Sequence, residues 1–210
     1  WSSDCDRRCS LRVPDPKPWH ASQFKHHFAG RSGYSLAVND DAGGWATTNR
    51  TLRLTGLNTF TGNIALAEGV LEFNTVTDIS GGASALGNGT AITTTAAGTL
   101  KFIGISPQAT NRPITTAGGA LTLSANGATA ADTITYNGLI TVGPATDGSQ
   151  IVLTGAAGRA GIITGGITMT ADLADATVNG GTWTHQTATS RIGDDMTVTG
   201  SGILSADMAN

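Results

Sequence analysis

Short runs of alternating apolar and polar residues dominate this chain from Ala46 onward. In each run two large apolar side chains flank one residue of another kind. Glycine or an Asn-Gly pair commonly follows. This two-residue period is that of a β-strand, so the runs predict short strands buried on one face, and no segment after residue 45 carries a helical stripe. The runs span residues 52–54, 64–66, 71–73, 100–102, 121–123, 134–136, 140–142, 151–153, 167–169 and 196–198.

A glycine followed shortly by an apolar dyad forms a longer repeat, with a mean spacing of about 22 residues. A period of this length is typical of solenoids, in which each unit buries its apolar face on its neighbours. If one period is one coil, the region holds roughly seven or eight coils in a rod on the order of 35 Å long. A β-sandwich is the alternative fold, although sandwiches seldom repeat a glycine-plus-dyad signature. The repeat glycines are Gly69, Gly98, Gly119, Gly138, Gly166, Gly181 and Gly202.

Residues 1–45 differ in composition from residues 46–210. The first region holds both cysteines, three of the four histidines and three of the four tryptophans. Its alternating Pro14, Pro16 and Pro18 oppose both a helix and a central strand. We interpret residues 1–45 as an irregular leader or linker, or as sequence not native to the fold, and residues 46–210 as the β-solenoid repeat region. Because the chain begins at Trp1 and ends within repeat-like sequence, we expect it to be a fragment.

The net charge is −3, and charged residues make up only 13% of the chain. This gives no electrostatic case for binding nucleic acid or an anionic membrane. No apolar run approaches the roughly 18 residues of a membrane-spanning helix.

Residues 54–62 read Leu-Thr-Gly-Leu-Asn-Thr-Phe-Thr-Gly, and Gly69-Val-Leu71 follows. This sequence resembles the autotransporter-associated β-strand repeat of bacterial passenger domains, with one departure at Ile64, where the family commonly has threonine. Residues 85–89 and 111–114 resemble the segments between such repeats. The resemblance implies a right-handed parallel β-helix that is secreted or displayed on the cell surface, within a large protein whose terminal membrane barrel is not part of this sequence.

The function that follows is structural or adhesive, as a passenger segment, and the protein is expected not to be an enzyme. No catalytic, metal-binding or cofactor-binding residue and no cofactor is assigned. The expected partners are neighbouring repeats of the same long chain and a surface glycan or a host or matrix component. The residues expected to carry the fold are Leu54, Phe60, Leu66, Leu71, Phe73, Leu100, Phe102, Leu121, Leu123, Ile140 and Val142.

A polysaccharide-active β-helix enzyme is the main functional alternative, because such enzymes use clustered carboxylates on one face. Its candidate residues are Asp172, Asp175, Asp194 and Asp195, with Glu68 and Glu72 earlier in the chain. Cys5 and Cys9 with His20, His26 and His27 form the one metal-like cluster, and a Cys5–Cys9 disulfide is the interpretation that suits an exported protein better than zinc. The disulfide state is left open.

An ice-binding or glycan-binding solenoid is the third hypothesis. Trp183 and His185 share one face of a predicted strand, as either a sugar-stacking platform or one packed rung. Four Thr-x-Thr pairs each place two hydroxyl groups on one side of a strand. Whether the pairs form one flat face is not determined by the sequence. The pairs begin at Thr133, Thr168, Thr182 and Thr197.

Overall fold

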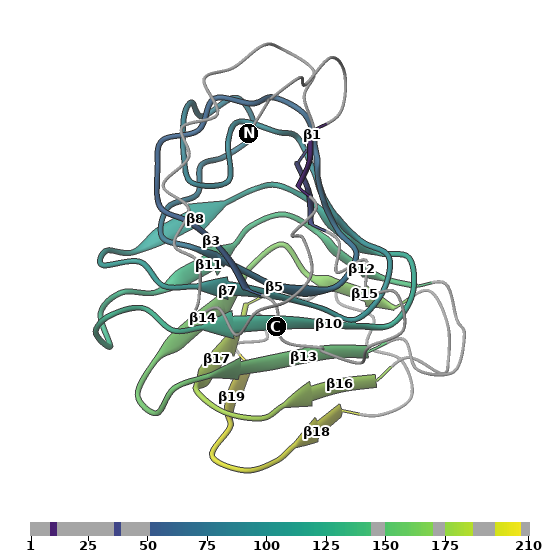
Figure 1. Ribbon diagram of the computed structural model, residues 1–210. Helices are drawn as coiled ribbons and strands as arrows, with labels where there is room; N and C mark the ends of the chain where they lie inside the picture. Colours follow the sequence, from purple (N-terminus) through teal and green to yellow (C-terminus); the bar gives the residue numbers. More distant parts are fainter. Residues whose placement is uncertain are drawn as a thin grey trace, which may run out of the picture.

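The computed structural model describes residues 9–11, 36–38, 51–143, 150–169, 175–186 and 196–206. These residues form short β-strands joined by turns and contain no helix. The strands belong to three sheets, and every pair of neighbouring strands within a sheet is parallel (Figure 1). We call them sheets A, B and C.

Each sheet is a stack of strands from successive turns of the chain. Sheet A contains β1 (Cys9–Leu11), β2 (Leu36–Val38), β4 (Ile64–Leu66), β6 (Ile92–Thr94), β9 (Ile114–Thr116), β12 (Ile140–Val142) and β15 (Ile167–Met169). Sheet B contains β3 (Thr51–Leu54), β5 (Gly69–Phe73), β7 (Gly98–Phe102), β10 (Ala120–Ala125), β13 (Gln150–Gly155), β16 (Asp175–Val178) and β18 (Met196–Val198). Sheet C contains β8 (Gln108–Thr110), β11 (Ile134–Tyr136), β14 (Ala160–Ile163), β17 (Thr182–His185) and β19 (Ile203–Ala206).

From β6 to β17 the chain visits sheets A, B and C in that order and then returns to sheet A one layer further along, whereas before β6 the described strands belong to sheets A and B alone. This path, with parallel strands throughout, is a β-solenoid, so the predicted fold class is confirmed and the β-sandwich alternative is wrong. The right-handed coiling of the helix that the resemblance implies stays a prediction.

About four turns of the solenoid are complete, with a strand in each sheet; they begin at β6, β9, β12 and β15. Sheet B stacks seven strands in the described residues, close to the seven or eight coils expected from the sequence, but only about four turns have a strand in all three sheets. The glycine-plus-dyad unit marks strands of all three sheets: Gly98 begins β7 of sheet B, Gly166 precedes β15 of sheet A, and Gly181 precedes β17 of sheet C.

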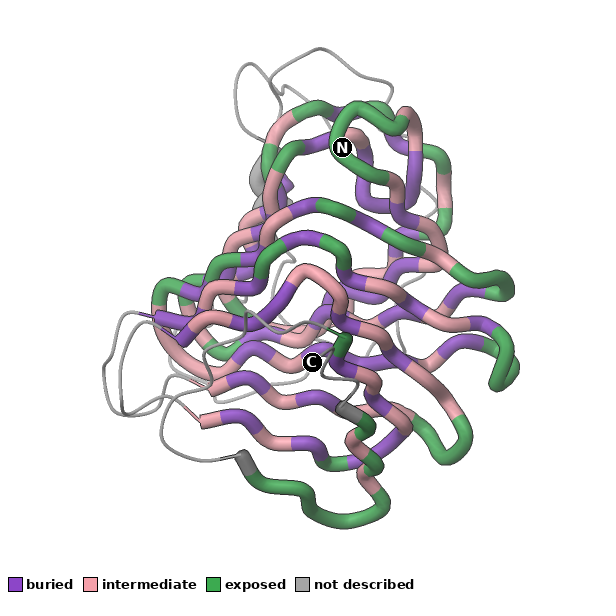
Figure 2. Tube along the Cα trace, turned by 180° about the vertical axis from the view of Figure 1, so that it is seen from behind, coloured by how far each residue is buried: buried purple, intermediate pink, exposed green. Residues whose placement is uncertain are grey.

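The core lies inside the coil and consists of columns of side chains stacked in register. In sheet A, Ile64, Ile92, Ile114, Ile140 and Ile167 occupy equivalent positions and are all buried. In sheet B, the column from Leu71 through Leu100, Leu123 and Leu153 to Val178 is buried in the same way. Figure 2 shows the resulting alternation of buried and partly exposed residues along the strands.

All eleven residues predicted to carry the fold are buried, which confirms their placement. Parallel pairing satisfies the backbone groups between turns, and burial of the columns supplies the apolar contacts that no single turn could make alone.

Two strands from residues 1–45 extend sheet A, because β1 pairs with β2 and β2 pairs with β4. Most of this region lies outside the described residues. The division at residue 45 therefore stays a prediction.

Candidate functional site

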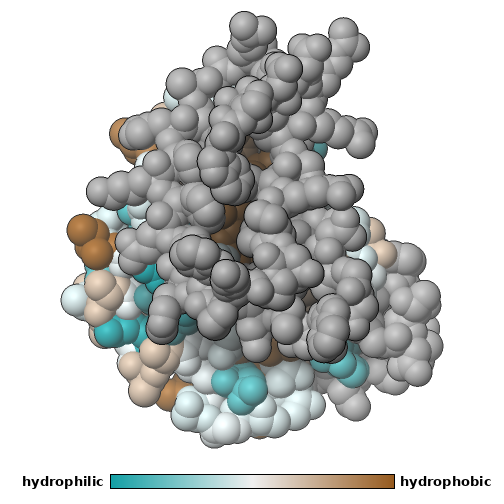
Figure 3. Space-filling view, viewed as in Figure 1, coloured by the Kyte–Doolittle hydropathy of each residue, from teal (hydrophilic) through white to brown (hydrophobic). Residues whose placement is uncertain are grey.

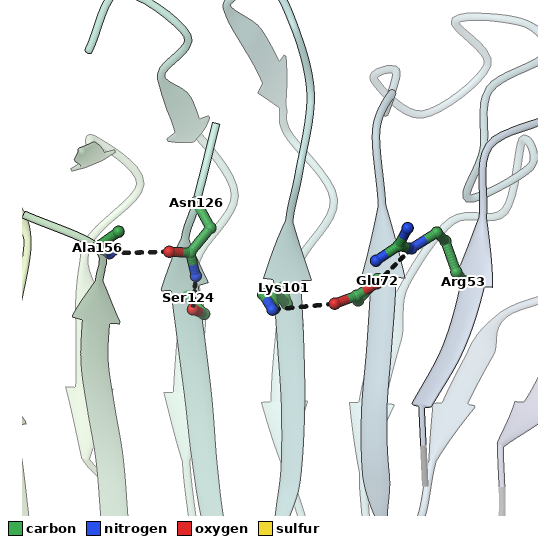
Figure 4. Close-up of polar contacts among 6 residues, drawn as sticks. All are labelled: Arg53, Glu72, Lys101, Ser124, Asn126 and Ala156. Atoms are coloured by element: carbon green, nitrogen blue, oxygen red, sulfur yellow. Dashed lines mark hydrogen bonds and ion pairs between the residues drawn. The ribbon is translucent and has the colours of Figure 1, made fainter. Parts of the chain in front are cut away.

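A column of polar side chains crosses the outer face of sheet B. The register of β3, β5 and β7 places Arg53, Glu72 and Lys101 side by side at outward positions, each one residue before the end of its strand. Glu72 accepts a hydrogen bond from Arg53 Nε, and its other carboxylate oxygen lies 3.0 Å from Lys101 Nζ (Figure 4). The Glu72 side chain is only 6% exposed, whereas its two partners are each 34% exposed.

The two cations determine the charge state of Glu72. Burial alone would raise the pKa of this carboxyl group, but hydrogen bonds and charge from Arg53 and Lys101 outweigh burial, so its pKa lies below the usual value. Glu72 is therefore ionised at neutral pH. A single carboxylate held between two cations is suited to stabilising three adjacent turns.

The same column continues without charge on the next strand. Ser124 of β10 follows Lys101 in register and accepts a hydrogen bond of 2.6 Å from the Asn126 side chain. The side-chain oxygen Oδ1 of Asn126 accepts a further bond of 2.8 Å from the backbone N–H of Ala156, in the following turn (Figure 4). These contacts tie neighbouring turns together along the outer face.

The acidic residues of the enzyme hypothesis are only partly described. Asp175 begins β16 and is half-buried, and Glu68 is exposed between β4 and β5. Glu72 lies between Arg53 and Lys101, and we call these three residues the charged column. Asp172, Asp194 and Asp195 lie outside the described residues. Whether those aspartates converge with Asp175 stays open.

The cysteine and histidine cluster also falls mainly outside the described residues. Cys9 begins β1, whereas Cys5, His20, His26 and His27 are not described. In the part of the chain that is described, no group of three or more His, Cys, Asp or Glu residues is arranged to hold a metal ion. The zinc and disulfide interpretations stay untested.

Trp183 points into the solenoid and is completely buried, so the sugar-platform interpretation is wrong and the packed rung is correct. Its ring stacks on Tyr136 with centroids 6.5 Å apart, and its Nε1 donates to the Thr154 carbonyl oxygen at 3.2 Å. Gly161 makes room for the ring, since a Cβ there would lie 2.4 Å from Trp183 Cζ3. His185, also buried, has a pKa below its usual value because burial disfavours the charged form.

The four Thr-x-Thr pairs do not form one face, because their described residues are spread over three sheets. Thr135, Thr182 and Thr184 belong to sheet C, Thr168 to sheet A and Thr197 to sheet B. A different threonine column exists on the outside of sheet A, where the register aligns Thr93, Thr115, Thr141 and Thr168 on four consecutive strands. We call this set the threonine column.

A buried arginine anchors the segment that covers one end of sheet C. Arg112, 1% exposed, lies between β8 and β9. Its Nη1 donates to the Leu86 carbonyl oxygen at 2.8 Å, and its Nη2 donates to the Gly87 carbonyl oxygen at 2.6 Å. Burial lowers the pKa of Arg112 to about 10, against the opposing charge of Asp78, so the guanidinium remains protonated at neutral pH.

The contacts of Arg112 and of Asn58 together join the three segments on which the family resemblance rests. Arg112 belongs to the segment 111–114, and its two acceptors belong to the segment 85–89. Asn58, inside the 54–62 motif, exchanges backbone hydrogen bonds with Ser84 and donates from its side chain to the Ala85 carbonyl oxygen at 2.8 Å. The motif residues therefore have a structural role: they fasten residues 74–91, which we call the cap segment, to the first turns.

The described outer surface is poor in charge. On the face shown in Figure 3 its residues are mostly pale, near the middle of the hydropathy scale, with scattered hydrophilic and hydrophobic residues. No helix in the described part of the chain is long and apolar enough to span a membrane.

No family model, curated protein or solved structure matches this chain. The family resemblance thus stands on its motif residues, and the finding that the structure adds is a parallel β-solenoid fold.

Proposed function

We propose that this chain is a structural or adhesive segment of a large bacterial protein that is secreted or displayed at the cell surface. The observation that carries the proposal is the unbroken interior column of sheet B, in which Leu71, Leu100, Leu123, Leu153 and Val178 stack on five consecutive strands. Such a column extends in one direction for as long as turns are added, which suits a stalk that holds other regions away from the membrane.

The outer surface supports the same proposal. Outward positions carry mainly threonine, alanine and serine, and the one described carboxylate with two close cations is used to pair adjacent turns. Side chains of this kind keep a rod soluble. The 54–62 motif and its contacts with the cap segment add the resemblance to exported passenger repeats.

Surface display with matched substitutions tests the proposal. The chain is fused to an export signal and an outer-membrane anchor, and an N-terminal tag is detected on intact cells before and after protease treatment. Leu123→Asp places a charge inside the solenoid, whereas Thr122→Asp places the same charge on the outside of the same strand.

We expect protease-resistant display for the wild type and Thr122→Asp, and loss of resistance for Leu123→Asp, because an unpaired buried carboxylate is strongly destabilising. Equal behaviour of the two variants would count against a solenoid stalk. Failure of the wild-type chain to resist protease on the cell surface would remove the proposed role.

The threonine column favours one second candidate, a solenoid that binds ice or glycan through the outside of sheet A. Four hydroxyl groups repeat there at the strand spacing of about 4.8 Å. Thermal-hysteresis and glycan-array measurements on the wild type and on Thr141→Tyr, which disrupts the flat column, test this candidate. Binding that is present in the wild type and lost in the variant supports it, and no signal in either assay eliminates it.

A further inference from the structure

Four Asn-Gly pairs lie in turns between the described strands, and the glycine of each pair is buried. This dipeptide is chemically labile, because glycine has no side chain to shield its backbone nitrogen from the amide carbon of the asparagine before it. The four glycines share this property, so the reactivity of a pair depends on how freely its asparagine side chain can turn toward the backbone. The pairs begin at Asn88, Asn126, Asn137 and Asn179.

Two of these asparagine side chains are held by short hydrogen bonds. Asn126 is fixed at both ends of its amide, because Nδ2 donates to Ser124 Oγ at 2.6 Å and Oδ1 accepts from the Ala156 backbone N–H at 2.8 Å. Asn137 Oδ1 accepts from Thr164 Oγ1, also at 2.6 Å. Rotation of either amide toward its glycine would break these bonds.

Asn179 lacks such a restraint. Within the described residues its side chain makes no hydrogen bond, although its Oδ1 lies beside Gly200 of the following turn, where an added Cβ would be 2.9 Å away. Asn179 is exposed, and so is Asn137, so exposure does not separate these two residues. Asn88 is intermediate, because its Oδ1 accepts from the Gly82 backbone N–H at a longer distance of 3.3 Å. Asn179 is therefore the asparagine of the four whose side chain is freest to turn.

We propose that Asn179-Gly180 is a site of spontaneous deamidation, and that hydrogen bonds protect the other described Asn-Gly pairs from the same reaction. The Gly180 backbone nitrogen attacks Asn179 Cγ and closes a succinimide ring. The Cγ–Nδ2 bond breaks, and Nδ2 leaves as ammonia with the proton that the Gly180 nitrogen gives up. Water then opens the ring at one of its two carbonyl carbons and yields aspartate or isoaspartate, each of which carries a negative charge.

The isoaspartate product alters the turn between β16 and β17. It routes the main chain through Cγ, so the backbone gains a methylene group ahead of Gly180. This turn has little room: Gly180 and Gly181 adopt φ values of +131° and +69°, and a Cβ on Gly181 would lie 3.1 Å from Gly155 Cα. We expect the added length to displace β17, whose register places Trp183 opposite Gly161.

Timed peptide mapping of the whole chain tests the proposal. The purified protein is incubated in warm, mildly alkaline buffer, and mass spectrometry follows the conversion of amide to acid at each of the four pairs. We expect Asn179 to convert fastest, and Asn126 and Asn137 to convert at least about tenfold more slowly, because their hydrogen bonds hold the amide carbon out of the geometry for attack. Absence of conversion at Asn179, or equally fast conversion at Asn137, would overturn the proposal.

Matched variants at Thr164 test the protecting hydrogen bond. Thr164→Ala removes the hydroxyl group that holds Asn137, whereas Thr164→Ser keeps it. Conversion at Asn137 should rise several-fold in Thr164→Ala and stay at the wild-type rate in Thr164→Ser, with Asn126 unchanged in both. Equal conversion of Asn137 in the two variants would show that the hydrogen bond does not protect it.

The fraction that carries isoaspartate in place of Asn179, separated by chromatography, tests the structural consequence. It should melt several degrees below the fresh protein. Asn179→Asp adds the charge without lengthening the backbone and should melt close to the wild type. Equal melting temperatures for the isoaspartate fraction and Asn179→Asp would contradict the displacement of β17. None of these measurements involves export, so deamidation and the stalk function can fail separately.

Discussion

The interior column of sheet B predicts a position-dependent cost for one substitution, Leu→Ala. Leu100 lies in the middle of the column, is fully buried, and has Leu71 and Leu123 as its neighbours on adjacent strands. Leu52 belongs to the same column on β3, at its N-terminal end, and is only partly buried. The two residues thus offer the same side chain at the same strand position with different burial.

Leu100→Ala removes buried methyl groups and leaves a cavity between the side chains of Leu71 and Leu123, so it should lower the free energy of unfolding by about 2–5 kcal/mol. For a domain of this size, each 1 kcal/mol corresponds to a change in melting temperature of roughly 2–4 °C. Leu52→Ala should cost clearly less, about 1 kcal/mol, because part of the side chain is already in water.

Urea unfolding followed by circular dichroism, supported by calorimetry, measures both variants against the wild type. Equal losses of stability for Leu52→Ala and Leu100→Ala would refute the reasoning, because burial would then not determine the cost. An unchanged melting temperature for Leu100→Ala would show that this side chain is not inside the coil.

Three further predictions concern the polar contacts and the packed rung. Glu72→Gln should destabilise the protein at neutral pH. Because the pKa of Glu72 is lowered in the folded state, the loss of unfolding free energy relative to wild type should be complete above the unfolded pKa of about 4.3 and should disappear as pH falls through the folded pKa. Urea unfolding at several pH values measures this loss. Arg112→Met should leave two buried carbonyl oxygens without their donor, at about 1–3 kcal/mol each, and limited proteolysis should then cut the cap segment faster than in wild type. Gly161→Ala should cost about 1–3 kcal/mol through overpacking against Trp183 and shift the tryptophan emission spectrum, whereas unchanged emission would contradict the contact.

The strands with an apolar-x-apolar pattern were predictable because alternation reports directly which face is buried. Ile64–Leu66 and Ile140–Val142 are strands with the bounds that their runs predict. Several strands were missed, β8 and β14 among them: Gln108 and Gly161 occupy interior positions of sheet C, so neither strand has two large apolar side chains around one polar residue. Gly161 is inside because Trp183 of the next turn fills its space, and a pattern read along one strand does not contain that information.

The polar features depend on register between residues 19 to 35 positions apart in sequence. The charged column could have been found by aligning the runs at 52–54, 71–73 and 100–102, since their central residues are Arg53, Glu72 and Lys101. The buried Arg112 had no comparable signal. Its charge suggests an exposed residue, and only the tertiary position of the 85–89 carbonyl groups explains its burial.

Dipolar electron paramagnetic resonance on the threonine column tests the central claim, a parallel solenoid with turns in register. Spin labels are placed in a background without Cys5 and Cys9, on Thr115 paired with Thr93, Thr141 or Thr168. Stacking in register predicts separations of about one strand spacing for the pairs with Thr93 and Thr141 and about two for the pair with Thr168, with each spacing near 4.8 Å. The expected result is that the Thr115–Thr93 and Thr115–Thr141 label separations are equal and that the Thr115–Thr168 separation is twice as long. Separations that do not increase with the number of turns between the labels would contradict the solenoid.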